Sequence, residues 1–135
     1  MALFTNDAER LRITAAGSVL IGTTANPNST YKLAVKGKIA AQEVVVTQTG
    51  WSDFVFKDSY KLKPLDQVAD YVKKNKHLEG VPTEAEVKKN GMSVGEMQAK
   101  LLEKVEELTL HMIEMKKEND ELKTKVGELQ TKIER

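Results

Sequence analysis

Ten positions near the C-terminus of the chain follow one another in alternating steps of four and three residues, and nine of the ten are apolar. They are Leu101, Val105, Leu108, Met112, Met115, Asn119, Leu122, Val126, Leu129 and Ile133, and together we call them the seam. An apolar period of 3.5 residues keeps one stripe of a helix turned toward partner helices, as in a left-handed coiled coil. Residues 93–135 are therefore predicted to form a long helix that assembles in parallel with copies of itself.

The number of helices in this coiled coil stays open on the seam residues alone. β-Branched residues at position a with Leu at d favour two helices, and Asn119, a polar residue at a, favours the same state and a fixed register. Met112 and Met115 have flexible side chains that fit several packing arrangements, so they do little to specify the number of helices. Leu102 at e and Ile113 at b widen the apolar stripe, which favours more than two helices. A dimer and a trimer are both compatible with this pattern.

Residues 1–50 show the shorter alternation of β-strands. Leu11 and Ile13 alternate with two arginines, and the expected strands cover residues 10–13, 18–22, 31–35 and 39–47, with a loop at 23–30. Strands this short leave open edges within one chain, so we expect them to pair between chains around a threefold axis. The run Val44-Val45-Val46 is apolar on both faces, which predicts that the last strand is covered on both sides or lies between chains.

Residues 51–92 are predicted to form an aromatic and helical connector. Its expected core is Trp51, Phe54, Phe56, Tyr60, Leu65, Val68 and Tyr71. A helix is expected from Pro64 to Lys74, with Asn75 as its stop. Thr83 with Glu86 has the spacing of a capping box for a short helix that ends at Asn90-Gly91. Ser93 with Glu96 repeats this spacing at the start of the long helix. The predicted fold class is therefore fibrous α+β, in three segments: 1–50, 51–92 and 93–135.

Composition excludes several classes of function. The 135 residues carry a net charge of +1, and none of the three segments is basic enough for a nucleic-acid or membrane-surface patch. There are no cysteines, so neither disulfides nor thiolate metal sites form. We expect no signal peptide and no membrane insertion. Gly17, Gly22 and Gly37 lack phosphate-loop spacing. Neither His77 nor His111 has carboxylate neighbours suited to a metal site, so we expect no enzyme activity, cofactor or metal.

A series of motifs follows in a specific order along nearly the whole chain: residues 9–13, 17–24, 31–39, 51–56, 60–62, Leu65, 75–78, Val81-Pro82, Asn90-Gly91, 95–97 and 101–109. The first three resemble the strand repeats of phage-type tail-fibre proteins, a pattern often seen in Bacteroidetes sequences, and the later ones resemble the C-terminal region of the same proteins. The resemblance implies a homotrimeric fibre end-piece with intertwined strands and a trimeric coil, carried on a phage or phage-like particle. Together with the seam pattern, the resemblance favours a trimer over a dimer. Other fibre or baseplate proteins are the expected partners of this trimer.

Some related fibres cleave themselves at a serine, and Ser52-Asp53 stands where such a processing site would fall. The basic run of that pattern is replaced here by Phe54-Val55-Phe56, so we interpret Ser52-Asp53 as a turn.

We therefore expect a structural and assembly module of a homotrimeric tail or appendage fibre, in which the C-terminal coil sets trimerisation and register. The main alternative is a receptor- or glycan-binding tip, in which the loop 23–30 and its residues Asn26 and Asn28 would contact a cell surface. A scaffold component built from the coil is a third possibility.

Overall fold

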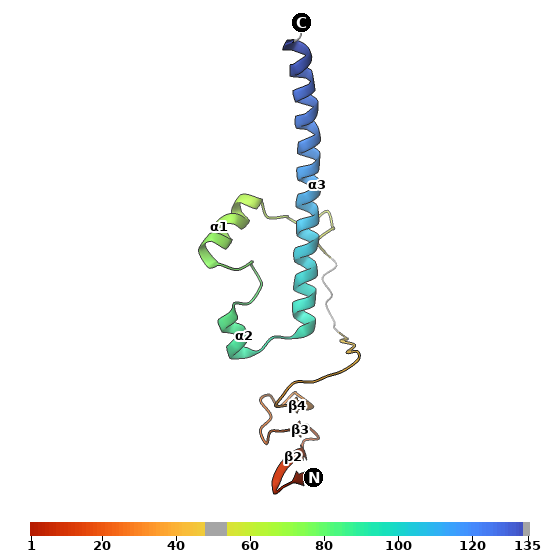
Figure 1. Cartoon of the computed structure of the whole chain (residues 1–135), viewed down its shortest axis with the longest axis vertical. Coiled ribbons are helices and arrows are strands. Elements are labelled where there is room, and N and C mark those ends of the chain that lie inside the picture. Colours follow the sequence, from red (N-terminus) through yellow and green to blue (C-terminus); the bar gives the residue numbers. More distant parts are fainter. Residues whose placement is uncertain (48–53, 134–135) are drawn as a thin grey trace. The chain divides into compact units, whose positions relative to one another are not determined.

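The computed structural model describes residues 1–47 and 54–133, and the chain divides into two compact units, Met1–Val45 and Val46–Arg135. In the described part of the chain, the first unit carries four short strands and the second carries three helices, the last of them long (Figure 1). This combination of a small sheet with a long C-terminal helix confirms the mixed α and β composition that the hydrophobic pattern predicts.

The strands β1 (Ala2–Thr5), β2 (Ala8–Ile13), β3 (Val19–Ile21) and β4 (Leu33–Val35) form one sheet in sequence order. The first two pairings are antiparallel and the pairing of β3 with β4 is parallel. Asn6 and Asp7, between β1 and β2, both have positive φ values, 50° and 57°. Two successive positive φ values are typical of the two-residue hairpin turn whose twist matches that of the strands it joins. All four strands thus find their partners within one chain.

The two faces of the sheet differ in what covers them. Cross-strand register places Arg12, Leu20 and Ala34 on one face, and Leu20 is only 1% exposed there. The opposite face carries two apolar rows, which we call the apolar sheet face: Leu3, Leu11, Ile21 and Val35 in the first row, and Ile13, Val19 and Leu33 in the second. Four of these seven side chains are exposed in the single chain.

The loop from residue 22 to residue 32 is held against the buried face by a small polar cluster. The Ser18 hydroxyl donates to the carbonyl oxygen of Tyr31 at 3.0 Å, and Asn26 Nδ2 donates to the same oxygen at 2.9 Å. Ser18 is itself buried beside Leu20. The sheet therefore has a small core on one side, sealed by its own loop.

The predicted strands differ from the observed ones in two places. β1 was not predicted, because the apolar and polar alternation of its residues is weak. Residues 39–47, predicted as a strand, form none, and Ile39, Val44 and Val45 are exposed. Apolar β-branched composition favours an extended backbone, but a strand also needs a neighbour for its hydrogen bonds, and no described segment of the chain supplies one.

The helices follow the capping signals closely. α1 (Leu65–Asn75) begins after Pro64, and α2 (Glu84–Asn90) begins with a complete capping box in which Thr83 and Glu86 bond reciprocally. α2 ends at Gly91, whose φ of 73° suits a residue without Cβ. α3 (Val94–Ile133) starts after Ser93, whose hydroxyl accepts from the Glu96 amide at 3.4 Å. Among the described residues, none of these helices is long and apolar enough to cross a membrane.

Candidate functional site

The seam of α3 is open along its whole length. Its nine apolar side chains are between 48% exposed at Leu101 and 83% exposed at Ile133, and Asn119 is exposed among them. A contiguous apolar stripe of this size in water is unfavourable, at roughly 25 cal/mol per Å² of apolar surface. The seam is therefore the strongest candidate for a contact surface in the described part of the molecule.

The connector covers a different side of the same helix. The buried residues of α3 are Gly95, Ala99, Glu103 and His111, and none of them belongs to the seam. At about 100° per residue, Ala99 and Glu103 lie on the side of the helix opposite the seam. The most deeply buried connector residue is Val55, which is 1% exposed. The chain thus packs on α3 without using the stripe that its sequence makes most apolar.

Beyond His111 the described chain buries no residue of the helix. Every residue from 112 to 133 is exposed, on all sides of the helix. A helix of this length is marginal in water when it stands alone, because most helix stability in proteins comes from burying one face. The described chain therefore gives the distal part of α3 no buried face to stabilise it.

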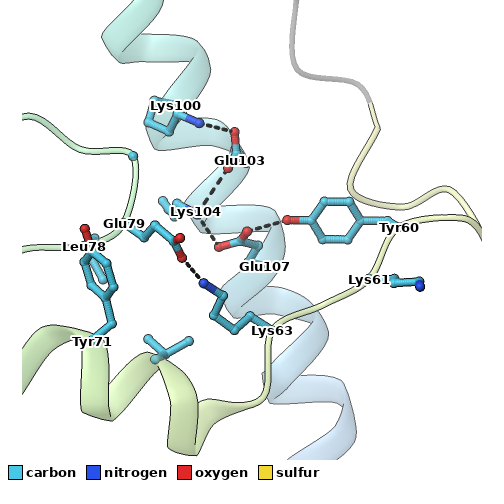
Figure 2. Close-up of a pocket in the computed structure, with 12 residues that line it drawn as sticks. Tyr60, Lys61, Lys63, Tyr71, Leu78, Glu79, Lys100, Glu103, Lys104 and Glu107 are labelled. Atoms are coloured by element: carbon cyan, nitrogen blue, oxygen red, sulfur yellow. Dashed lines mark hydrogen bonds and ion pairs between the residues drawn. The ribbon is translucent and has the colours of Figure 1, made fainter.

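A polar network joins the connector to the covered side of α3 (Figure 2). Lys104 Nζ lies 3.2 Å from Glu103 Oε1 and 2.8 Å from Glu107 Oε2, and Lys100 Nζ lies 2.7 Å from Glu103 Oε2. The Tyr60 hydroxyl donates to the second oxygen of Glu107, which ties the connector to this chain of charges. A separate ion pair joins Lys63 to Glu79 within the connector.

The ionisation of this network reflects its partial burial. Burial, followed by the hydrogen bond to the Glu107 carboxylate, raises the pKa of Tyr60 far above its usual range. Burial alone would disfavour the charged form of Glu103, but hydrogen bonds from Lys100 and Lys104 outweigh it and lower the pKa of Glu103. Burial likewise opposes the charge of Lys104, and the hydrogen bonds to Glu107 and Glu103 outweigh it and raise the pKa of Lys104. The network therefore prefers charged Glu103 and Lys104 beside a neutral Tyr60.

A cavity of about 320 Å³ lies between the connector and α3, and the network forms part of its wall (Figure 2). The ring of Tyr71 lines it, with the His77 ring edge-on at 5.7 Å between centroids and Lys63 Nζ 6.0 Å from the Tyr71 ring. Its acidic and basic side chains are largely paired with one another. In the part of the chain that the structure describes, no group of His, Asp and Glu is arranged to hold a metal ion.

The predicted connector core is only partly brought together. Tyr60, Val68 and Tyr71 are half-buried, and Phe54 stacks at a tilt on Tyr60 with 5.8 Å between ring centroids. Phe56 and Leu65 are exposed in the single chain. Trp51 lies outside the described residues, as does Ser52-Asp53. Sequence reasoning missed Val55, Glu103 and Glu107, although the Lys and Glu spacing along α3 marks a polar face.

The loop considered for receptor binding uses its polar groups internally. Asn26 Nδ2 donates to Tyr31, and Asn28 Oδ1 accepts from the amide of Thr30 at 2.9 Å and from its hydroxyl at 2.8 Å. These are turn-stabilising bonds that side-chain amides commonly make. Both asparagines thus have a structural role within the loop.

No model of a known protein family, no curated protein and no solved structure matches this chain. Its function is therefore argued from its own residues.

Proposed function

We propose that this chain is a structural and assembly module of a homotrimeric tail or appendage fibre, in which α3 gathers three copies and sets their register. The observation that carries the proposal is the placement of the seam. All ten seam positions are exposed, while the connector packs on the opposite side of the helix. A seam left free by the rest of its own chain is available for copies of the same helix.

The choice of three copies rests on the width of the apolar stripe and on the resemblance to trimeric fibres. Leu102, at e on the flank of the seam, is only half-buried and extends the stripe beyond the a and d positions. Two-stranded coils bury mainly a and d, whereas wider interfaces suit more helices. Met112 and Met115 adapt to either packing, so they do not oppose a trimer.

Assembly through α3 would also help the sheet unit. Association of separate chains costs translational and rotational entropy, and a contact between parts of chains already held together avoids most of that cost. The coil would thus make contacts between sheet units effectively intramolecular. In this respect α3 acts as an assembly device for the whole fibre segment.

The mass of the intact chain in solution tests the proposal. One chain has a mass of 15.1 kDa, so light scattering should give about 45 kDa, three times that value. A mass of about 30 kDa would replace the trimer with a dimer and remove the support from fibre resemblance. A single-chain mass at micromolar concentration would contradict self-assembly altogether.

Truncation tests the assembly role of the coil. A chain lacking residues 101–135 should be monomeric, disordered or aggregated, because it loses both the seam and the helix surface that the connector covers. A truncated chain that still forms a well-folded trimer would exclude the coil as the assembly element. Size exclusion with light scattering and circular dichroism distinguish these results.

The receptor-binding alternative has weaker support. Its candidate residues, Asn26 and Asn28, are engaged within their own loop, so a glycan would have to compete with those bonds. Loss of glycan-array binding on substitution of both asparagines, with the fold intact, would restore that alternative.

A further inference from the structure

The apolar sheet face is a second unpartnered surface, in the other unit of the chain. Its two rows contain no charged side chain, and Leu3 and Leu33 are each more than half exposed. Ile13 and Ile21, in the two central strands, are 37% and 38% exposed. Monomeric proteins rarely leave a contiguous apolar surface of this kind open, so it is expected to be covered in the functional state.

Within the sheet unit, no other described segment covers this face. The loop from residue 22 to residue 32 packs on the opposite face, where Ser18 and Asn26 anchor it. The exposed segment 39–47 contacts neither row closely enough to bury it, since the face keeps its exposure. The covering surface therefore comes from outside the described residues of the sheet unit.

The length of the chain between the two units indicates which surface that is. About twenty residues separate Val35, at the end of the sheet, from Val55, buried in the helical unit, and they span at most about 70 Å. Copies joined through α3 therefore keep each sheet unit within about 70 Å of the assembled helices, at effective concentrations of about a millimolar. Identical uncharged faces then meet without electrostatic repulsion, and at a far higher local concentration than any free protein.

We propose that the apolar sheet faces of the assembled copies pack against one another and form a shared core. The inference rests on the proposed assembly through α3 and adds a second interface to it. Contact is made through the faces of the sheets, whereas the expectation from the sequence was pairing of strand edges. The two outer strands β1 and β4 thus need no partner strand for the sheet units to associate.

Because the chain has no cysteine, single cysteines report on this contact in the full-length protein. Ile21→Cys places a thiol at the centre of the apolar sheet face. Ser29→Cys, in the exposed loop 23–30 of the same unit, is the matched control with the same tether. Val105→Cys in the seam reports on α3 itself. Each variant is treated with a short bifunctional maleimide at low micromolar concentration and examined on a denaturing gel.

Shared packing of the faces predicts that Ile21→Cys forms covalent dimers at least about ten times faster than Ser29→Cys, since tethering alone acts equally on both. Equal rates for these two variants, with rapid linkage of Val105→Cys, would overturn the face contact and leave assembly through α3 intact. Absence of linkage at Val105, together with a single-chain mass, would instead remove the proposed function. Leu33→Cys, in the second row of the face, repeats the test if the Ile21 variant loses its strand signal by circular dichroism.

Discussion

The two halves of α3 carry the same seam but differ in their surroundings. Residues 94–111 have the connector on one side, and their buried residues, such as Ala99 and Glu103, all lie off the seam. Residues 112–133 are all exposed in the described chain. The first half shows that intrachain packing avoids the seam even where it is close enough to use it. The second half shows that the helix extends well past the point where its own chain supports it.

This difference indicates two separate kinds of stability in one helix. The first half gains from polar docking of the connector, through Tyr60, Glu107 and Lys104. In the proposed assembly, the second half is stabilised by other copies through the seam. Substitutions in each half should therefore have distinct effects on mass, helix content and connector docking.

The largest effect is expected from a charge in the seam. Leu108→Glu in the first half and Leu122→Glu in the second should each reduce the mass toward that of one chain, because each replaces a side chain whose burial is worth about 1.5–3 kcal/mol per copy with a charge. Leu122→Glu should also lower helix content, since residues 112–133 lose their only support. Light scattering and circular dichroism measure both effects.

Thr124→Glu is the matched control, because position 124 lies on the outer face of the same helix, opposite the seam. It should leave the mass unchanged. If Leu122→Glu also kept the mass of the parent protein, the seam would not be the contact surface in the distal half.

A smaller effect of opposite sign is expected at Asn119, in the unsupported half. Asn119→Val should raise the thermal midpoint, because one buried valine per copy adds at most roughly 1.5–3 kcal/mol of stability. It should also broaden the mass distribution as register control is lost. Thr124→Val gains no burial and should leave the thermal midpoint and the mass distribution unchanged. A sharper mass distribution in Asn119→Val would contradict the register role.

The features that the sequence predicts well are those determined locally. Thr83 and Glu86 cap α2 because their spacing is sufficient to satisfy the helix end, whatever surrounds it. The seam is equally local, since a 3.5-residue period defines a stripe on any straight helix. Both could be located without knowledge of the rest of the fold.

The features that the sequence predicts poorly depend on partners far away in the chain. Residues 39–47 have the composition of a strand but no neighbouring strand to pair with. Val55 was overlooked between two larger phenylalanines, because burial depends on what a segment docks against rather than on side-chain size. A glutamate on a helix is usually exposed, but Glu103 is buried because Lys100, Lys104 and the connector surround it.

A still smaller effect separates the connector from the seam. Tyr60→Phe removes the hydrogen bond to Glu107 and should lower the free energy of connector opening by about 1–2 kcal/mol, measured from hydrogen exchange of α1 amides. The mass should stay unchanged, because the seam is untouched. Tyr71→Phe, which keeps the ring contacts with His77 and Lys63, should leave exchange close to that of the parent. Equal effects of the two substitutions would show that the Tyr60 hydroxyl contributes nothing specific.

The smallest expected effect is a pH dependence confined to the docked half. The raised pKa of Tyr60 contributes stability that is complete below about pH 10 and is lost as the pH rises through the higher folded value, and the raised pKa of Lys104 acts in the same direction. The lowered pKa of Glu103 contributes stability that is present above about pH 4.3 and is lost as the pH falls through the folded value. Connector docking should therefore be most stable between roughly pH 5 and pH 10.

Tyrosinate absorbance measures the alkaline limb directly. The absorbance should contain a component that titrates clearly above the usual pKa of about 10, and Tyr60→Phe should remove that component. Hydrogen exchange of α1 should accelerate over the same pH range, whereas assembly through the apolar seam of residues 112–133 owes nothing to the Tyr60 proton. If Tyr60→Phe removed no component above the usual pKa, Tyr60 would not be held by Glu107 in solution. The connector would then pack on α3 by apolar contact alone, and the two halves of the helix would differ in coverage but not in their response to pH.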